Sequence, residues 1–263
     1  MGIYPVTAKK SLGQHFLNDQ NIAEKIVNAL EETHPGEILE VGPGTGVLTR
    51  FLLQNHPDHC RFVEVDQESI HFLIEKYPEI RPWLFKQDFL TFDLPAYYQG
   101  GVSVIGNFPY NISSQIFFKI LEHRDQIPSV VCMIQKEVAE RISAAPGSKT
   151  YGILSVLLQA WYRIEYLFTV NEQVFLPPPK VKSGVIRLIR NEEHHLHCDE
   201  ILFKQVVKTG FNQRRKMLSN SLKSLIGSGN EQNPMLSKRP EQLSVAEFVE
   251  LTNWCEKIIS GKA

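Results

Sequence analysis

Residues 107–110, "NFPY", place an amide, two aromatic rings and a proline directly after the apolar run "GVSVI" and one glycine. The run predicts a buried strand, because β-branched residues fill it and glycines bound it. Pro109 fixes its own φ and biases Phe108 towards an extended backbone, so the Asn107 side chain and the Phe108 carbonyl are expected in one set geometry. Such a pair of acceptors suits a planar polar group. On this stretch alone, a strand-to-helix turn with Phe108 and Tyr110 in the core is an equal interpretation.

A glycine loop precedes two acidic residues at predicted strand ends. The stretch "ILEVGPGTGVLT" indicates a strand, a loop with Gly42, Gly44 and Gly46, and a helix start. Its GxGxG spacing is one residue shorter than the dinucleotide fingerprint, but glycines still let a backbone approach a ligand at the mouth of a sheet. Glu64 ends the second strand, where a carboxylate accepts both hydroxyls of a ribose, and Asp88 ends the third, where it accepts from an adenine amine. Either acid alone is also compatible with a helix N-cap or a solvated loop.

These residues together predict an adenosine-containing cofactor. The sequence has no GxxxxGK[ST] motif to grip phosphates, which favours S-adenosylmethionine over a nucleoside triphosphate.

The elements that must position these residues alternate between short apolar runs and helical patterns from about residue 37 to 189. That alternation predicts an α/β fold with a parallel sheet covered by helices on both faces. Segments 164–170 and 183–189 are joined by a proline-rich link without a helix, which predicts an antiparallel pair at one sheet edge. After a polar segment, helical spacing replaces the strand pattern. We therefore predict two domains, residues 1–190 and a small all-helical domain of residues 191–263.

The overall charge gives no sign of a nucleic-acid partner. Lys and Arg total 28 against 29 Asp and Glu, a formal net charge of -1, so any such surface must be local. Residues 203–223 carry six basic side chains and no acid. A second basic cluster contains Lys180, Lys182, Arg187 and Arg190. The run is compatible with a solvated helix face, but we expect the two clusters to bind phosphates. The residues expected to contact RNA are Lys180, Lys182, Arg214, Arg215 and Lys216.

The spacing of cysteines and histidines and the hydropathy of the chain indicate whether a metal site or a membrane span is to be expected. The four cysteines form no CxxC pair, and the histidines at 194, 195 and 197 have no acidic or thiol partner at helical ligand spacing, so no metal site is predicted. No apolar stretch approaches the length of a membrane span, and the N-terminus lacks the apolar region of a signal peptide. We expect a cytoplasmic monomer without membrane or metal.

The chain carries, in order, the motifs "KKSLGQHFLND", "ILEVGPGTGVLT", "VEVD", "QDFL", "IGNFPYNIS", "MIQKEVAERI", "PPPKVKSGVIRL" and "GFNQRRKML". Together they resemble the ribosomal RNA small-subunit adenine dimethyltransferases (KsgA/RsmA family). The match runs from Lys9 to the C-terminal helices and covers nearly the whole chain. The resemblance is therefore specific.

The resemblance implies a Rossmann-like methyltransferase domain that uses S-adenosylmethionine, with residues 1–20 covering the cofactor site, and a helical domain for RNA or ribosome recognition. It implies conversion of two adjacent adenines, in a hairpin loop near the 3′ end of 16S rRNA, to N6,N6-dimethyladenosine in an assembling small subunit. Some relatives have Asn in place of His15 and Leu in place of Phe108. These differences matter little if backbone atoms make the contacts, and the resemblance implies no role for the His15 ring. The implied catalytic residues are Asn107, Phe108, Pro109 and Tyr110. An adenine amine is a weak nucleophile, since its lone pair is delocalised into the ring, so the Asn107 oxygen and the Phe108 carbonyl are expected to accept its hydrogens and orient that lone pair, while Tyr110 stacks on the base. An amide takes no proton, so catalysis is expected to rest on proximity and alignment. The implied cofactor contacts are His15, Leu17, Gly42, Glu64, Asp88 and Asn107.

Two other interpretations remain at this point. A methyltransferase of the related macrolide-resistance type modifies a large-subunit rRNA adenine through a similar site, although "PPPKVKSGVIRL" and "GFNQRRKML" favour the small-subunit enzyme. A ribosome-assembly or transcription factor that retains the fold and transfers no methyl group is the second. The intact glycine loop, both acids and the amide favour catalysis. Methyl incorporation from labelled cofactor separates catalysis from binding alone.

Overall fold

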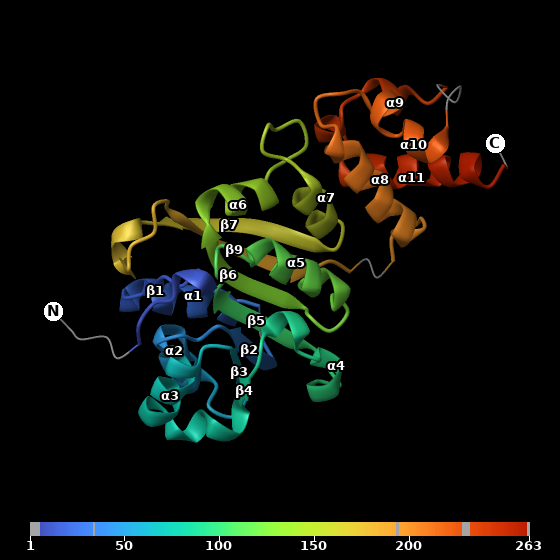
Figure 1. The fold of residues 1–263 in the computed structure, drawn as a ribbon. Helices are drawn as coiled ribbons and strands as arrows, with labels where there is room; N and C mark the ends of the chain where they lie inside the picture. Colours follow the sequence, from blue (N-terminus) through green and yellow to red (C-terminus); the bar gives the residue numbers. More distant parts are fainter. Residues whose placement is uncertain (1–5, 34, 193–194, 228–231, 262–263) are drawn as a thin grey trace. The chain divides into compact units, whose positions relative to one another are not determined.

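The computed structural model describes residues 6–33, 35–192, 195–227 and 232–261 (Figure 1). They form two compact units, each described by itself. Unit 1 comprises the chain up to residue 139 together with residues 163–190, and unit 2 comprises residues 140–162 and the chain from 191 onward. The predicted boundary after residue 190 coincides with one of these divisions. Residues 140–162, placed in the first domain from the sequence, group with the helical unit instead.

Unit 1 is built on a seven-stranded mixed sheet. Its strands are β2 (Glu37–Val41), β3 (Cys60–Glu64), β4 (Leu84–Lys86), β5 (Val102–Asn107), β6 (Ser129–Gln135), β7 (Tyr162–Val170) and β9 (Ser183–Arg190). They lie in the order β4, β3, β2, β5, β6, β9, β7, and the first five run parallel. The chain builds outward from β2 to β4 and then from β5 to β6, so the strand order reverses between β2 and β5. Open α/β sheets bind ligands at the carboxyl ends of their strands at such a reversal.

The two segments predicted as an edge pair form β7 and β9, which are neighbours at one edge of the sheet. β9 pairs antiparallel with β6, from Ser129 opposite Ile189 to Gln135 opposite Ser183. The link between β7 and β9 contains β8 (Phe175–Leu176), which pairs antiparallel with β1 (Phe16–Leu17) in a separate small sheet. This pairing fastens β1 to the link.

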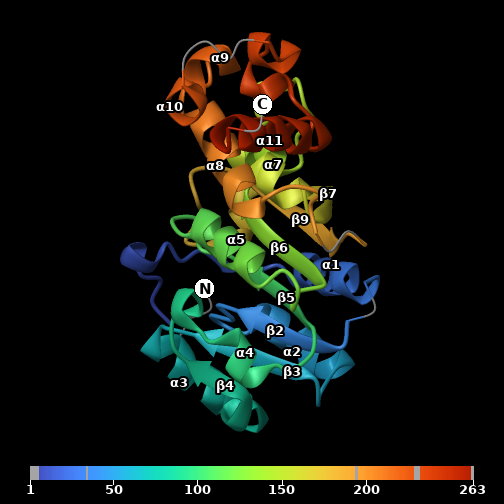
Figure 2. The ribbon, with the colours of Figure 1, turned by 90° about the vertical axis from the view of Figure 1, so that its right-hand side faces the viewer.

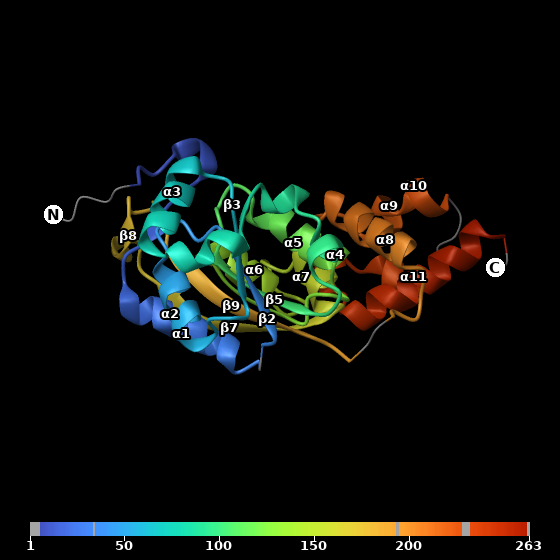
Figure 3. The same cartoon turned by 90° about the horizontal axis from the view of Figure 1, so that it is seen from below.

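Helices cover both faces of the sheet, as predicted. α1 (Gln20–Glu31) and α2 (Val47–Asn55) lie on one face and α5 (Ser113–Glu122) lies on the other (Figures 2 and 3). α1 begins where the Asp19 side chain accepts a 3.1 Å hydrogen bond from the Ile22 amide, an N-cap that satisfies a free donor of the first turn. The other helices of this unit are η1 (Lys10–Leu12), α3 (Gln67–Lys76), η2 (Pro78–Trp83), η3 (Phe89–Thr91), α4 (Leu94–Tyr97) and η4 (Glu172–Val174), and α6 (Lys136–Ile142) begins in it.

Side chains of β2 are buried on both faces of the sheet, as expected where helices cover both faces. Ile38 and Leu39 are neighbours on β2, so their side chains point to opposite faces of the sheet, and both are fully buried. A parallel strand with helices on both faces has this pattern. Within the described ranges, every helix is too short or too polar to span a membrane.

Unit 2 consists of helices and turns in the residues that the structure describes, apart from the start of β7. Its helices are α7 (Ile153–Gln159), α8 (Glu200–Asn212), α9 (Leu218–Ser221), α10 (Lys223–Ile226), η5 (Pro234–Ser237), η6 (Pro240–Gln242) and α11 (Val245–Ile259). Phe211 on α8 stacks on Phe248 of α11, with ring centroids 6.0 Å apart, and Phe203 meets Trp161 edge-on. α7 and α8 pack together, which explains why residues 140–162 belong to this unit.

Candidate active site

A cavity of about 230 Å³ lies at the carboxyl ends of β2, β3, β4 and β5 in unit 1. This is the reversal point of the sheet, where a ligand site is expected. Residues from the N-terminal segment, including Ser11 and Gln14, form part of its wall. The predicted site residues that line it are His15, Gly42, Glu64, Asp88, Asn107, Phe108, Pro109 and Tyr110.

Leu17 is the predicted cofactor residue that the structure places elsewhere. Its side chain is 3% exposed and packs in the hydrophobic core of unit 1. Phe16 lines the cavity instead, because successive side chains of a strand point to opposite sides. A Cβ atom at Gly44 would lie only 2.9 Å from the Phe16 ring, so this glycine lets the ring close over the loop. Phe16 stands beside Leu17 in the quoted motif, but only the register of β1 on β8 tells the two apart.

Gly42 shapes the floor of the cavity. Its φ of +69° is a left-handed conformation that favours glycine, and its amide donates a 2.9 Å hydrogen bond to the Val63 carbonyl. A Cβ atom built at Gly42 meets no atom within 4 Å. The loop therefore brings bare backbone to the cavity, which suits close approach by a ligand.

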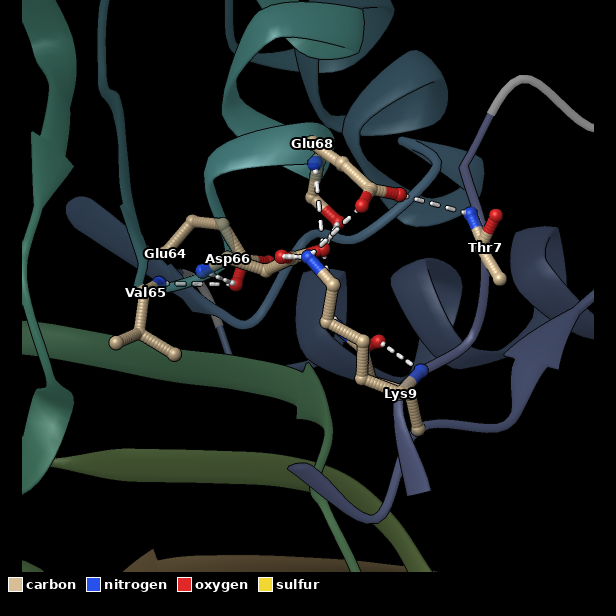
Figure 4. Close-up of polar contacts among 8 residues, drawn as sticks. Thr7, Lys9, Glu64, Val65, Asp66 and Glu68 are labelled. Carbon is tan, nitrogen blue, oxygen red and sulfur yellow. Dashed lines mark hydrogen bonds and ion pairs between the residues drawn. The ribbon is translucent and has the colours of Figure 1, made fainter. Parts of the chain in front are cut away.

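Glu64 is held in place by backbone donors. One carboxylate oxygen accepts from the Gly44 amide at 3.0 Å. The other accepts from the Val65 and Asp66 amides at 2.9 Å each (Figure 4). The residue is 5% exposed. Burial raises the pKa of Glu64, while the three backbone donors act to lower it. An ionised carboxylate has about four acceptor sites, so capacity remains for a ligand hydroxyl.

Asp88 lies two residues beyond the end of β4 and has two roles at once. Its side chain accepts a 2.9 Å hydrogen bond from the Leu90 amide and so caps η3. It also lines the cavity, as does the buried ring of Phe89 beside it. The helix-cap interpretation of Asp88 and its place in the candidate site are therefore compatible.

The Asn107 amide has a fixed orientation. Its Nδ2 donates a 2.8 Å hydrogen bond to the backbone carbonyl of His15, which leaves the oxygen as the amide's acceptor atom. The next residue, Phe108, donates its amide to the Met133 carbonyl at 3.0 Å, and its buried ring packs edge-on against Phe117. His15 meets Asn107 through a backbone atom, so an Asn at position 15 would preserve this contact.

Tyr110 is tethered through its hydroxyl. The hydroxyl lies 2.6 Å from the Ser183 Oγ atom, and the ring lies beside that of His15, with centroids 5.4 Å apart and planes tilted by 33°. His15 Nδ1 lies 2.8 Å from the Pro177 carbonyl oxygen. Burial raises the pKa of Tyr110, partly opposed by the hydrogen bond to Ser183, so the phenol stays neutral at physiological pH. Ser183 and Pro177 belong to the quoted motif "PPPKVKSGVIRL", but sequence reasoning gave them no role.

The basic residues expected to contact RNA differ in exposure and in whether their side chains already bind within the protein. In unit 1, Lys180 and Lys182 are exposed. In unit 2, Arg215 and Lys216 are exposed, whereas Arg214 donates to the carbonyls of Ser148, at 3.4 Å, and of Lys149. Arg214, Arg215 and Lys216 also line a surface recess of unit 2. Arg215 and Lys216 are therefore better placed than Arg214 to meet a phosphate.

Two arginines of the second basic cluster are engaged in ion pairs. Arg187 binds Glu165 at 2.6 Å and also Glu32, and Arg190 lies 3.3 Å from Asp125. Their side chains are only 13% and 10% exposed. Because both guanidinium groups are paired with carboxylates of unit 1, they contribute little to a phosphate-binding surface.

No group of three or more His, Cys, Asp or Glu side chains within the described residues could hold a metal ion. His194, one of the clustered histidines, lies outside the described residues.

Two solved structures share this fold. A dimethyladenosine transferase from Plasmodium falciparum superposes with a TM-score of 0.74 at 24% identity, covering 94% of this chain and 98% of that one. The 23S rRNA methyltransferase ErmE gives a TM-score of 0.66 at 24% identity, covering 89% and 99%. The fold is thus that of the Rossmann-like methyltransferases, as the sequence predicts.

Sequence comparison defines the family. Residues 6–257 match the model of the ribosomal RNA adenine dimethylases. Proteins named ribosomal RNA small subunit methyltransferase A are 55% identical in Parabacteroides distasonis, covering 98% of this chain and 97% of that protein, and 57% identical in Cytophaga hutchinsonii, covering 98% and 99%. The chain belongs to the ribosomal RNA adenine dimethylase family, and it is a methyltransferase.

Proposed function

We propose that this protein transfers methyl groups from S-adenosylmethionine to the N6 amines of two adjacent adenines in a hairpin loop near the 3′ end of 16S rRNA, giving N6,N6-dimethyladenosine. The single observation that carries this proposal is the orientation of the Asn107 amide. Its Nδ2 donates to the His15 carbonyl, which leaves the Asn107 side-chain oxygen as an acceptor at the cavity wall. A protein that only bound RNA would have no need for that constraint beside an adenosine site.

The cavity suits the cofactor in its donor and acceptor set. Glu64 would accept the ribose hydroxyls, Asp88 would accept the adenine amine, and the bare backbone at Gly42 would lie against the methionine end. The aromatic rings of Phe16 and Phe89 in the wall offer apolar contact to the base. When bound, S-adenosylmethionine supplies an electrophilic methyl group.

The target half of the cavity acts by alignment. The Asn107 oxygen and the Phe108 carbonyl accept the two amine hydrogens, which turns the nitrogen lone pair towards the methyl donor. Tyr110 stacks on the adenine, and its tether to Ser183 holds the ring in place. After the first transfer one amine hydrogen remains, so one acceptor still orients the nitrogen for the second. Each transfer would leave S-adenosylhomocysteine and a positively charged, acidic nitrogen, and the proton would then pass from that nitrogen to water, because an amide cannot accept it.

RNA loops suit this site, since their bases are already unstacked and enter a pocket at low cost. We infer that Lys180 and Lys182 in unit 1 and Arg215 and Lys216 in unit 2 bind phosphates, and that the near-neutral protein needs a partly assembled small subunit for full affinity. We therefore also propose a cytoplasmic location.

Labelled methyl incorporation tests the proposal. Small and large ribosomal subunits from cells that lack the gene are incubated separately with the protein and methyl-labelled S-adenosylmethionine. We expect up to four methyl groups per small subunit, two on each adenine, and none on large subunits. Label in the large subunit would favour the macrolide-resistance type of activity, and no label in either would favour a binding protein.

A further inference from the structure

The N-terminal segment, residues 7–15, forms one wall of the cavity and is fastened by side chains. Residues 11 to 15 line the cavity. In the described part of the chain, each hydrogen bond from this segment to the rest of unit 1 involves a side chain. Two of them are from Asn111 Nδ2 to the Ser11 carbonyl, at 3.5 Å, and from Asn107 Nδ2 to the His15 carbonyl. Breaking contacts of this kind would remove no hydrogen bond of the sheet, so release of the segment would not require unit 1 to unfold.

The other end of the segment is held by charge. Lys9 Nζ forms an ion pair with the Asp66 carboxylate and a second one, of 3.2 Å, with Glu68 (Figure 4). The Thr7 amide donates to the other Glu68 oxygen at 3.2 Å. The Asp66 side chain is 2% exposed, whereas those of Lys9 and Glu68 are 34% and 47% exposed. We call Lys9, Asp66 and Glu68 the latch.

Asp66 connects the latch to the cofactor half of the cavity. Its amide donates to Glu64, while its carboxylate accepts from Lys9 and, at 3.4 Å, from Gln14 Nε2. Gln14 Oε1 in turn accepts from the Lys9 amide at 2.8 Å. Burial acts to raise the pKa of Asp66, but hydrogen bonds from Lys9, Ser69 and Gln14 outweigh it and lower that pKa. One ionised residue thus supports the Glu64 carboxylate and anchors the segment in front of it.

We infer that Lys9 is a positioning residue: its ion pairs in the latch hold residues 7–15 against the ribose end of the cavity and so slow the release of S-adenosylmethionine and of its product. Lys9 itself does not line the cavity among the described residues, so it acts through the segment. The inference rests on the proposed function in taking S-adenosylmethionine as the ligand and Glu64 as its ribose contact. Because Lys9 and Glu68 are partly exposed, salt screens the latch and should speed release.

The neighbouring lysine provides a matched control. Lys9→Ala removes the latch cation, Lys10→Ala removes the same charge one residue away, and Lys9→Arg retains the cation. Stopped-flow measurement of S-adenosylhomocysteine release should show roughly fivefold faster release for Lys9→Ala, the scale of a partly exposed ion-pair network. Lys10→Ala and Lys9→Arg should release at the wild-type rate. KM for the cofactor should rise with Lys9→Ala, while single-turnover methyl transfer at saturating cofactor is unchanged.

Salt gives a second arm of the same experiment. Raising the ionic strength should speed release from the wild type and leave Lys9→Ala nearly unaffected, because the variant has no latch to screen. Equal release rates in the wild type and Lys9→Ala would overturn the inference, and so would an equal effect from Lys10→Ala.

Amide hydrogen exchange on the cofactor-free protein tests the latch without reference to any ligand. Lys9→Ala should exchange faster in residues 7–15 and at the wild-type rate in β2 and β3. Unchanged exchange in the segment would overturn the latch even if the protein methylates RNA. Failure of the wild type to bind S-adenosylmethionine would instead overturn the proposed function, with the exchange result still deciding whether the segment is latched.

Discussion

The two halves of the cavity are held in different ways. In the cofactor half, backbone amides at positions 44, 65 and 66 hold the Glu64 carboxylate. In the target half, side chains meet segments far along the chain: Asn107 binds the carbonyl of His15, 92 residues away, and Tyr110 binds Ser183, 73 residues away. The cofactor half is therefore a product of adjacent strand ends, whereas the target half is complete only when distant segments have come together.

This difference predicts that substitutions in the two halves have separable effects. A change in the cofactor half should alter cofactor affinity, because Glu64 and Asp88 would contact the ground-state ligand. A change in the target half should alter the rate, because its contacts matter most when the amine and the methyl group are aligned.

The largest effect is expected at Asn107. Asn107→Ala removes the acceptor that orients the amine, so turnover should fall by about 100-fold or more, the scale of losing one preorganised partner of a transition state. RNA affinity and cofactor affinity should change little. Steady-state kinetics beside filter binding and calorimetry make this comparison, with the exposed Asn55→Ala on α2 as control. A parallel loss of RNA affinity would mean that Asn107 binds the substrate without aligning it.

The next largest effect is expected at the two acids. Glu64→Gln replaces a carboxylate held by three amide donors with a side chain that carries donors itself, and cofactor affinity should fall by on the order of tenfold or more. Asp88→Asn should cost less, because part of the Asp88 side chain is used to cap η3. Calorimetry with S-adenosylmethionine checks both, with exposed Glu75→Gln as control. Unchanged affinity in both variants contradicts their assignment.

A smaller effect is expected at the tether between Tyr110 and Ser183. Tyr110→Phe and Ser183→Ala should each slow methylation by about threefold to tenfold, since each removes one hydrogen bond that holds the ring. The double variant should be no slower than the slower single one, while Tyr110→Ala should be far worse because stacking is lost. Additive effects in the cycle would show that the hydroxyl does something other than hold the ring.

A modest effect on RNA affinity is expected from the exposed cations of unit 2. The double variant Arg215→Ala/Lys216→Ala should flatten the plot of log affinity against log salt by about 1.4, if each residue neutralises one single-strand phosphate. Cofactor binding should not change. The double variant Arg81→Ala/Lys86→Ala removes two exposed charges elsewhere in unit 1 and should leave the slope intact. Equal slopes for all three proteins would leave Arg215 and Lys216 as ordinary surface residues.

The smallest effect on activity is expected at Glu40, a buried residue of β2, where the change should appear in the pH dependence of stability. Burial raises the pKa of Glu40 to about 8, a hydrogen bond from Thr49 opposes this shift, and the charge of Glu64 adds to it. The native state keeps this proton between about pH 4.5 and 8 while the unfolded state releases it, so its contribution to stability is lost as the pH rises through that range. Glu40→Gln should remove this dependence. Denaturant unfolding of both proteins at pH 5 and pH 8 measures it, and parallel pH profiles would contradict the assignment.

The same contrast explains what the sequence could predict. Gly42, Glu64, Asp88 and Asn107 stand at strand ends, which are local signals, and all four line the cavity. The choice between Phe16 and Leu17 depends on the register of β1 against β8, which no local pattern specifies.

Other features depend on tertiary contacts. The tethers from His15, Ser183 and Lys9 join segments whose meeting is set by the whole fold. The predicted boundary after residue 190 leaves residues 140–162 in the first domain, whereas the packing of α7 on α8 assigns them to unit 2. Motif resemblance marked most of these positions without showing what each one contacts.

The most direct test of the account is mass mapping of methyl groups on 16S rRNA from cells that lack the gene and carry either the wild-type protein or Asn107→Ala. The account predicts two adjacent N6,N6-dimethyladenosines near the 3′ end with the wild type. It predicts unmodified or sparsely methylated adenines with Asn107→Ala expressed at the same level. Full dimethylation by the variant, or wild-type methyl groups on another base or subunit, would contradict it.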